Sequence, residues 1–164
     1  MFDEELSRNQ DDEFNYRLTK AGMKIWLTNN TGITYHVRSS FAKLFRQYYQ
    51  YGYWKVYVNK KHKTITTFRQ LMPLLFVLFL AGGATMSLLF PALAKAYFTL
   101  LLFYLLLAMV FALTVTKNFG QTPAVLIAFI IIHFAYGWGY LLGIIDFILL
   151  RKSNPNACKS SLNR

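Results

Sequence analysis

The second half of this chain is almost free of charge. Between residues 71 and 150 the only charged side chains are Lys95, Lys117 and Asp146. Since the core of a soluble domain cannot take up so much contiguous apolar sequence, this half is predicted to lie in a membrane. A break at Pro91 and a polar turn at residues 117–122 divide this half into three apolar runs. Each is long enough for a helix to cross the hydrocarbon layer, at residues 71–90, 96–116 and 124–150.

A basic collar precedes the first apolar run, and the net charge of the chain is +11. The collar consists of Arg38, Lys43, Arg46, Lys55, Lys60, Lys61, Lys63 and Arg69. Its position favours binding to anionic lipid headgroups or phosphates. Nucleic acid is a weak alternative, because no groove-reading or RNA-binding motif is present.

The positive-inside rule predicts a cytoplasmic collar. Three spans then put residues 151–164 on the other side, although this polar tail, predicted to be disordered, also carries cations. Either the collar dominates or one run does not fully cross; we interpret the pattern as three spans. His133 and Asp146 are ionisable groups inside the third run, where we expect His133 to pack or to hydrogen-bond within the bundle. Small residues near them, such as Gly139, favour close helix contacts.

Acidic residues gather at the other end of the chain. Apart from Asp146, all of them lie between Asp3 and Glu13. One interpretation is structural, since Asp11 or Asp12 can cap a helix and acids in its first turn favour the helix dipole. The other is chemical, because any acid–base catalysis in this chain has to use this cluster.

Residues 10–21 have the pattern of a helix that ends at Gly22. Phe14, Leu18 and Ala21 lie on one face of it, which is predicted to meet a core. Further along, the chain predicts short strands and then an aromatic, cation-rich helix that lies in the headgroup layer, with a kink at Gly52. The strands are expected at residues 24–27 and 33–37, and the helix from Ser39 or Ser40 to about residue 58.

Two motifs together resemble a known family. Residues 9–18 have the sequence Asn-Gln-Asp-Asp-Glu-Phe-Asn-Tyr-Arg-Leu, and residues 46–55 have Arg-Gln-x-x-x-Tyr-Gly-x-x-Lys. With Phe2-Asp3-Glu4, Ala21-Gly22 and residues 24–27, they resemble the back half of the catalytic domain of family 2 glycosyltransferases. The similarity is to the membrane-bound succinoglycan type of exopolysaccharide synthesis, and it covers about residues 2–63.

The resemblance implies an α/β fold. Residues 1–63 would be the C-terminal part of a GT-A type catalytic domain, with the interfacial helix. An α-helical membrane domain of about three transmembrane helices would follow at residues 64–150, before the tail. The implied location is the cell inner membrane, with the catalytic part on the cytoplasmic side.

The resemblance also implies the chemistry. Inverting transfer of a sugar needs a base for the acceptor hydroxyl, and the motif points to Asp11, with Asp12 as the rival. Gln10 stands where the family has a Glu. The candidate substrate-binding residues are Gln10, Arg38, Arg46 and Gln47. Cations near the donor diphosphate would stabilise the leaving group, for which Arg46 and Arg38 are candidates, and Gln47 could hydrogen-bond the diphosphate or the acceptor. Binding of a lipid headgroup is an equal alternative for Arg46.

The family binds a nucleotide-sugar and a divalent metal, Mg²⁺ or Mn²⁺, with an Asp-x-Asp motif in its N-terminal half. This sequence has no Asp-x-Asp, and its single Cys158 excludes a multi-cysteine zinc site. We therefore expect no metal site in this chain, and expect a fragment that lacks the donor half and acts on a lipid-linked saccharide acceptor.

Two other functions remain open. One is a non-enzymatic small integral membrane protein whose basic collar docks a partner or anionic lipid. The other is a small transporter subunit, which is weaker because one Asp and one His make a poor ion path. The acidic motif separates them from the enzyme, since an anchor has no use for it at this spacing from Arg17.

Overall fold

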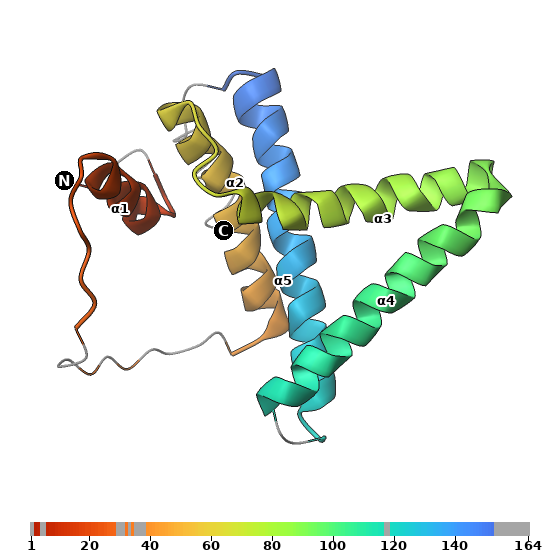
Figure 1. The fold of residues 1–164 in the computed structure, drawn as a ribbon. Coiled ribbons are helices and arrows are strands. Elements are labelled where there is room, and N and C mark those ends of the chain that lie inside the picture. Colours follow the sequence, from red (N-terminus) through yellow and green to blue (C-terminus); the bar gives the residue numbers. More distant parts are fainter. Residues whose placement is uncertain are drawn as a thin grey trace.

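The computed structural model describes residues 2–3, 6–28, 32, 34, 39–116 and 119–152. Every regular element in these ranges is a helix (Figure 1). The elements are α1 (Gln10–Lys20), α2 (Phe41–His62), the short 3₁₀ turn η1 (Phe68–Leu71), α3 (Met72–Leu89), α4 (Pro91–Thr116), α5 (Thr122–Gly143) and the π-helical turn η2 (Ile144–Leu149).

The predicted α/β fold is therefore wrong for the described part of the chain. Residues 24–27 form no strand, and Trp26 and Leu27 are 86% and 100% exposed. A strand needs a neighbour to take up its backbone hydrogen bonds, and the described residues provide none here. Most of the second predicted strand, residues 33–37, lies outside the described residues.

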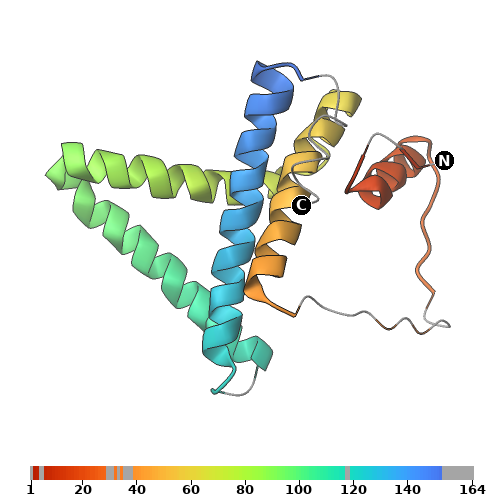
Figure 2. The ribbon, with the colours of Figure 1, turned by 180° about the vertical axis from the view of Figure 1, so that it is seen from behind.

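Helices α2 and α5 form the spine of the molecule and lie side by side in both views (Figures 1 and 2). Phe45 contacts Phe134, and Tyr53 contacts Phe147, so the two helices run in the same direction. Tyr53, Trp54 and Phe147 are each 1% exposed. The aromatic residues expected in a headgroup layer thus supply much of the core between two helices.

Glycines allow the two backbones to approach closely. A Cβ at Gly139 would lie 2.1 Å from the backbone oxygen of Tyr49, and one at Gly52 would lie 2.1 Å from that of Tyr136. The predicted close contact through the small residues of α5 is confirmed. Gly52 marks no break, because α2 continues through it, and its role is to admit α5.

Three helical segments are long and apolar enough to cross a membrane, as predicted: Phe68–Leu89, Pro91–Thr116 and Thr122–Leu149. Phe90, before Pro91, has an extended backbone, which ends α3. In Figure 1, α3 projects from the spine and α4 returns to the start of α5. His133 of α5 hydrogen-bonds within the helical bundle, as expected. Its Nδ1 atom lies 3.2 Å from the hydroxyl of Tyr104 in α4 and 3.0 Å from the Phe129 carbonyl in α5 itself.

Helix α1 lies beside the spine, on α2. It ends as predicted, with Gly22 in the left-handed region at φ +77°. The predicted caps are wrong: the N-cap is Asn9, which makes no side-chain cap bond, and the two aspartates lie inside the first turn. The apolar stripe is not the buried face either. Glu13 is the buried residue of α1, because α2 offers polar partners to this helix.

Candidate functional site

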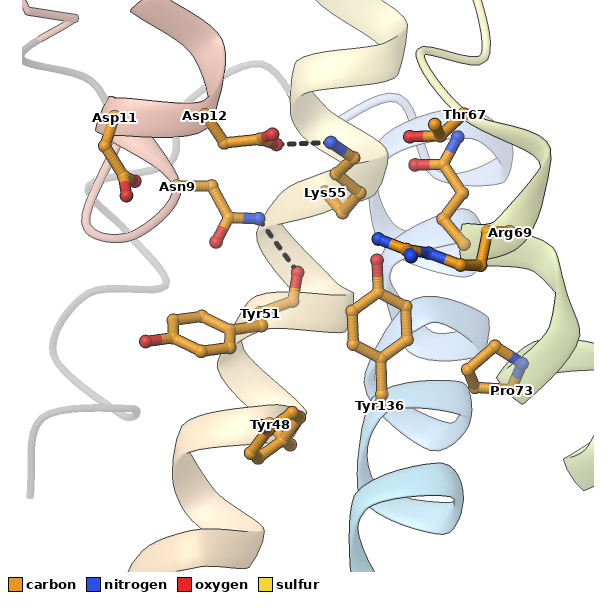
Figure 3. A pocket seen from close by; sticks show the side chains of 11 residues that line it. Asn9, Asp11, Asp12, Tyr48, Tyr51, Lys55, Thr67, Arg69, Pro73 and Tyr136 are labelled. Atoms are coloured by element: carbon orange, nitrogen blue, oxygen red, sulfur yellow. Dashed lines mark hydrogen bonds and ion pairs between the residues drawn. The ribbon is translucent and has the colours of Figure 1, made fainter. Parts of the chain in front are cut away.

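A cleft of about 550 Å³ opens where α1 faces α2, the start of α3 and the middle of α5 (Figure 3). Four segments line it. They contribute Asn9, Asp11 and Asp12 from the start of α1; Tyr48, Tyr51 and Lys55 from α2; Thr67, Arg69, Gln70 and Pro73 from the entry to α3; and Tyr136 from α5. The cleft thus joins the acidic cluster to the first turn of the first membrane-length helix.

Asp12 forms an ion pair with Lys55 across the cleft. The Lys55 side chain is 8% exposed and the Asp12 side chain 49%. Beside them, the Asn9 amide donates a hydrogen bond of 3.0 Å to the Tyr51 carbonyl. These contacts hold the start of α1 over α2 and place a cation next to the Asp12 carboxylate.

Asp11 also lines the cleft but is arranged differently. Neighbouring residues of an α-helix point about 100° apart, so the two aspartates cannot both face Lys55. Within the described residues, the exposed Asp11 side chain makes no hydrogen bond or ion pair. Asp11 is therefore the carboxylate of this pair that remains open to an incoming group.

The opposite side of the cleft carries a cation and an amide at the entry to α3. Arg69 is exposed, and Figure 3 shows its guanidinium reaching into the cleft from the side opposite Asp11. Gln70 is 7% exposed, yet neither polar atom of its amide has a hydrogen-bond partner in the described structure. A buried polar group without a hydrogen-bond partner lowers the stability of the fold by about 1–3 kcal/mol, so this amide is a candidate for binding a ligand.

The other residues predicted from the sequence lie around the cleft rather than in it. Gln10 donates hydrogen bonds to the carbonyls of Leu6 (2.7 Å) and Asp3 (3.2 Å), which fixes the preceding segment. Gln47 donates to the Tyr51 hydroxyl at 2.8 Å and so touches a lining side chain. Arg46 is exposed on α2 and does not line the cleft, whereas Arg38 lies outside the described residues.

Sequence reasoning assigned Lys55 and Arg69 to a lipid-binding collar and missed Gln70 altogether. The Asp12–Lys55 pair joins residues 43 positions apart, which no local pattern reveals. A polar Arg-Gln pair directly before an apolar run was the one signal for Arg69 and Gln70.

The cleft does not fit a divalent metal. In the part of the chain that the structure describes, no three His, Cys, Asp or Glu side chains come together as metal ligands. Asp12 is paired with Lys55, and Asp11 projects from the helix about 100° away from Asp12. The two acids of the cleft are therefore arranged as separate groups and not as a chelating pair.

A comparison with known proteins supports the resemblance over part of the chain. The chain is 41% identical over 73 residues to the succinoglycan biosynthesis protein ExoA of Rhizobium meliloti (strain 1021). The match covers 44% of this chain and 22% of that protein. No family model matches the chain. No solved structure matches it either.

Proposed function

We propose that this chain forms the acceptor side and the membrane anchor of an inverting glycosyltransferase that acts in exopolysaccharide synthesis. The observation that carries the proposal is the open carboxylate of Asp11 in a cleft next to the first membrane-length helix. The similarity to a succinoglycan biosynthesis protein supports the same class of reaction. A nucleotide-sugar and its Mg²⁺ or Mn²⁺ are assigned to a donor-binding domain and not to this cleft.

In the proposed reaction, Asp11 removes the proton from an acceptor hydroxyl as its oxygen attacks the anomeric carbon of the donor sugar. The new bond joins that oxygen to the sugar, and the bond from the sugar to the nucleoside diphosphate breaks. Asp12 is the weaker choice for the base, because Lys55 already neutralises its carboxylate. Arg38 and Arg46 remain proposals for stabilising the leaving diphosphate.

Asp11→Asn is expected to lower the transfer rate by about 10²–10⁴-fold, which is the usual contribution of a general base. The carboxamide is close in shape but cannot accept the proton. Transfer of labelled sugar to membrane lipid, measured in the protein with its donor-binding domain, tests this. Nucleotide affinity is expected to be unchanged.

Asp12→Asn is the matched control. It loses the ion pair to Lys55 and a charge at the helix start, where a charge contributes about 0.3–1 kcal/mol. A much smaller loss of rate is expected. A dead Asp12→Asn beside an active Asp11→Asn would move the base by one residue, and two active variants would leave the acids as structural groups.

The proposed location is the inner membrane, with α1 and α2 at its cytoplasmic face. The three membrane-length helices support membrane association, and the collar supports this orientation. A reporter fused before residue 2 is expected to be active in the cytoplasm. A periplasmic reporter contradicts the proposal, because nucleotide-sugars are cytoplasmic.

A non-enzymatic protein that docks on anionic lipid is the second candidate. The exposed cations of α2, among them Lys43 and Lys60, favour it. In this case both aspartate variants leave the cellular phenotype intact, whereas neutralising these lysines removes it.

A further inference from the structure

Gln70, which lines the cleft, has a buried side-chain amide without hydrogen-bond partners among the described residues. Its side chain is more than nine-tenths buried and lines the cleft, but its amide nitrogen and oxygen have no partner in the described structure. Leaving both atoms unpaired costs free energy that an apolar side chain of similar size would avoid. An amide donates and accepts hydrogen bonds, and a sugar hydroxyl does both in return.

Arg69, the residue before Gln70, supplies the complementary chemistry. Its guanidinium reaches into the same cleft and makes no hydrogen bond or ion pair with the described residues. A guanidinium matches the oxygens of a phosphate with paired hydrogen bonds. An open cation and an unpaired amide on adjacent residues therefore fit a phosphate joined to a sugar.

The position of this pair indicates where such a ligand would come from. Arg69 and Gln70 lie at the beginning of Phe68–Leu89, the first segment that is long and apolar enough to cross a membrane. A group held there is within reach of the lipid headgroup layer. Asp11 lies on the opposite side of the cleft (Figure 3), so a ligand anchored at Arg69 extends toward the open carboxylate.

We propose that Arg69 and Gln70 bind the junction between phosphate and sugar in a lipid-borne glycosyl diphosphate, with Arg69 on the phosphate and the Gln70 amide on a sugar hydroxyl. The proposal rests on the function proposed above and assigns the acceptor's subsite. It orients the acceptor with its phosphate toward the entry of α3 and its sugar toward Asp11.

Equilibrium binding to the full chain in vesicles of zwitterionic lipid tests the proposal without any turnover. The probes are a synthetic lipid diphosphate that carries one hexose, the same lipid diphosphate without the hexose, and a nucleoside diphosphate hexose. The hexose-bearing lipid is expected to bind tightest. Two results would contradict a lipid-borne ligand. One is tighter binding of the nucleoside diphosphate hexose than of the hexose-bearing lipid. The other is loss of nucleoside diphosphate hexose binding in Arg69→Gln.

Arg69→Gln is expected to weaken binding of both lipid diphosphates by about tenfold or more, since it removes charge-assisted hydrogen bonds. Lys60→Gln is the matched control, because Lys60 is an exposed cation of the same collar that does not line the cleft. An equal loss in Lys60→Gln would show a diffuse attraction to charge and overturn the subsite.

Gln70→Leu separates a ligand role from a structural one. Because the amide has no partner in the fold, the thermal midpoint is expected to stay or rise. The preference for the hexose-bearing lipid over the bare lipid diphosphate is expected to fall at least several-fold. An unchanged preference overturns the role of Gln70. These binding measurements involve no transfer of a sugar, so loss of binding in the Arg69 and Gln70 variants and loss of transfer in Asp11→Asn are separate results.

Discussion

The two faces of α2 are held in opposite ways. Toward α1 and the segment before it, helix α2 is joined by polar contacts: Lys55 with Asp12, Lys61 with Asp3 at 2.6 Å, His62 with Glu13 at 2.9 Å, and Gln50 with Arg8 at 3.0 Å. Toward α5, it is joined mainly by glycine contacts and buried aromatic rings, together with a buried hydrogen bond of 3.0 Å from the Asn59 amide to the Tyr140 hydroxyl. Partly exposed ion pairs contribute little and weaken with salt, whereas close packing does not. The cleft therefore has one firm wall, α2 with α5, and one weaker wall, α1.

The largest effect is expected on the firm wall. Gly139→Ala places a methyl carbon only 2.1 Å from the Tyr49 carbonyl oxygen. A backbone atom cannot rotate away as a side chain can. The free energy of unfolding is therefore expected to decrease by an amount near the upper end of the usual range for overpacking, which is about 1–3 kcal/mol. The thermal midpoint in a mild detergent, followed by tryptophan fluorescence, measures it.

Gly82→Ala is the matched control for this prediction. A Cβ at Gly82, in α3, meets nothing within 4 Å. Alanine is also the better helix former, so the midpoint is expected to hold or to rise slightly. If the Gly139 and Gly82 variants melt alike, the close contact between α2 and α5 is not what holds the spine together.

An intermediate effect is expected at the best-buried contact of the weaker wall. Glu13 is 1% exposed, and its Oε1 atom lies 2.8 Å from Nε of Arg17 and 2.9 Å from Nε2 of His62. Charge-assisted hydrogen bonds are roughly twice as strong as neutral ones, so Glu13→Gln is expected to weaken the docking of α1 by about 1–2 kcal/mol.

Hydrogen exchange of the α1 amides is the measurement for Glu13→Gln. A loss of this size raises the open population about 5–30-fold, and exchange in α1 should quicken accordingly while α5 stays protected. Equal acceleration in both helices contradicts the idea that the two walls are held independently.

The smallest effect is expected at the rim of the weaker wall. Lys61 pairs with Asp3, but the Lys61 side chain is 40% exposed. Lys61→Gln is expected to change the docking of α1 by at most about 1 kcal/mol at low salt and by less in molar salt. Lys20→Gln, an exposed cation on α1 without an ion pair in the described structure, serves as the control. A larger loss in molar salt than in dilute buffer would contradict the electrostatic origin.

Local patterns in the sequence predicted what depends on local physics. Helix α1 and its end at Gly22, the membrane-length helices and the break at Pro91 follow from periodicity, hydropathy and backbone preferences. The strand at residues 24–27 was predicted from composition and is wrong, because a strand exists through its neighbours. The structural role of Gly52 could not be predicted from the sequence either, since a glycine inside a helix is compatible with a kink or with a close helix contact.

For the site, the sequence by itself determined that carboxylates gather near residue 11, that cations gather before the first apolar run and that three helices can cross a membrane. Only the tertiary structure decided which carboxylate stays open. Lys55 comes from another helix to neutralise Asp12, and Gln70 is buried without a partner beside the exposed Arg69. The physical reason is that charge and hydropathy belong to each residue, whereas pairing and burial depend on segments that only folding brings together.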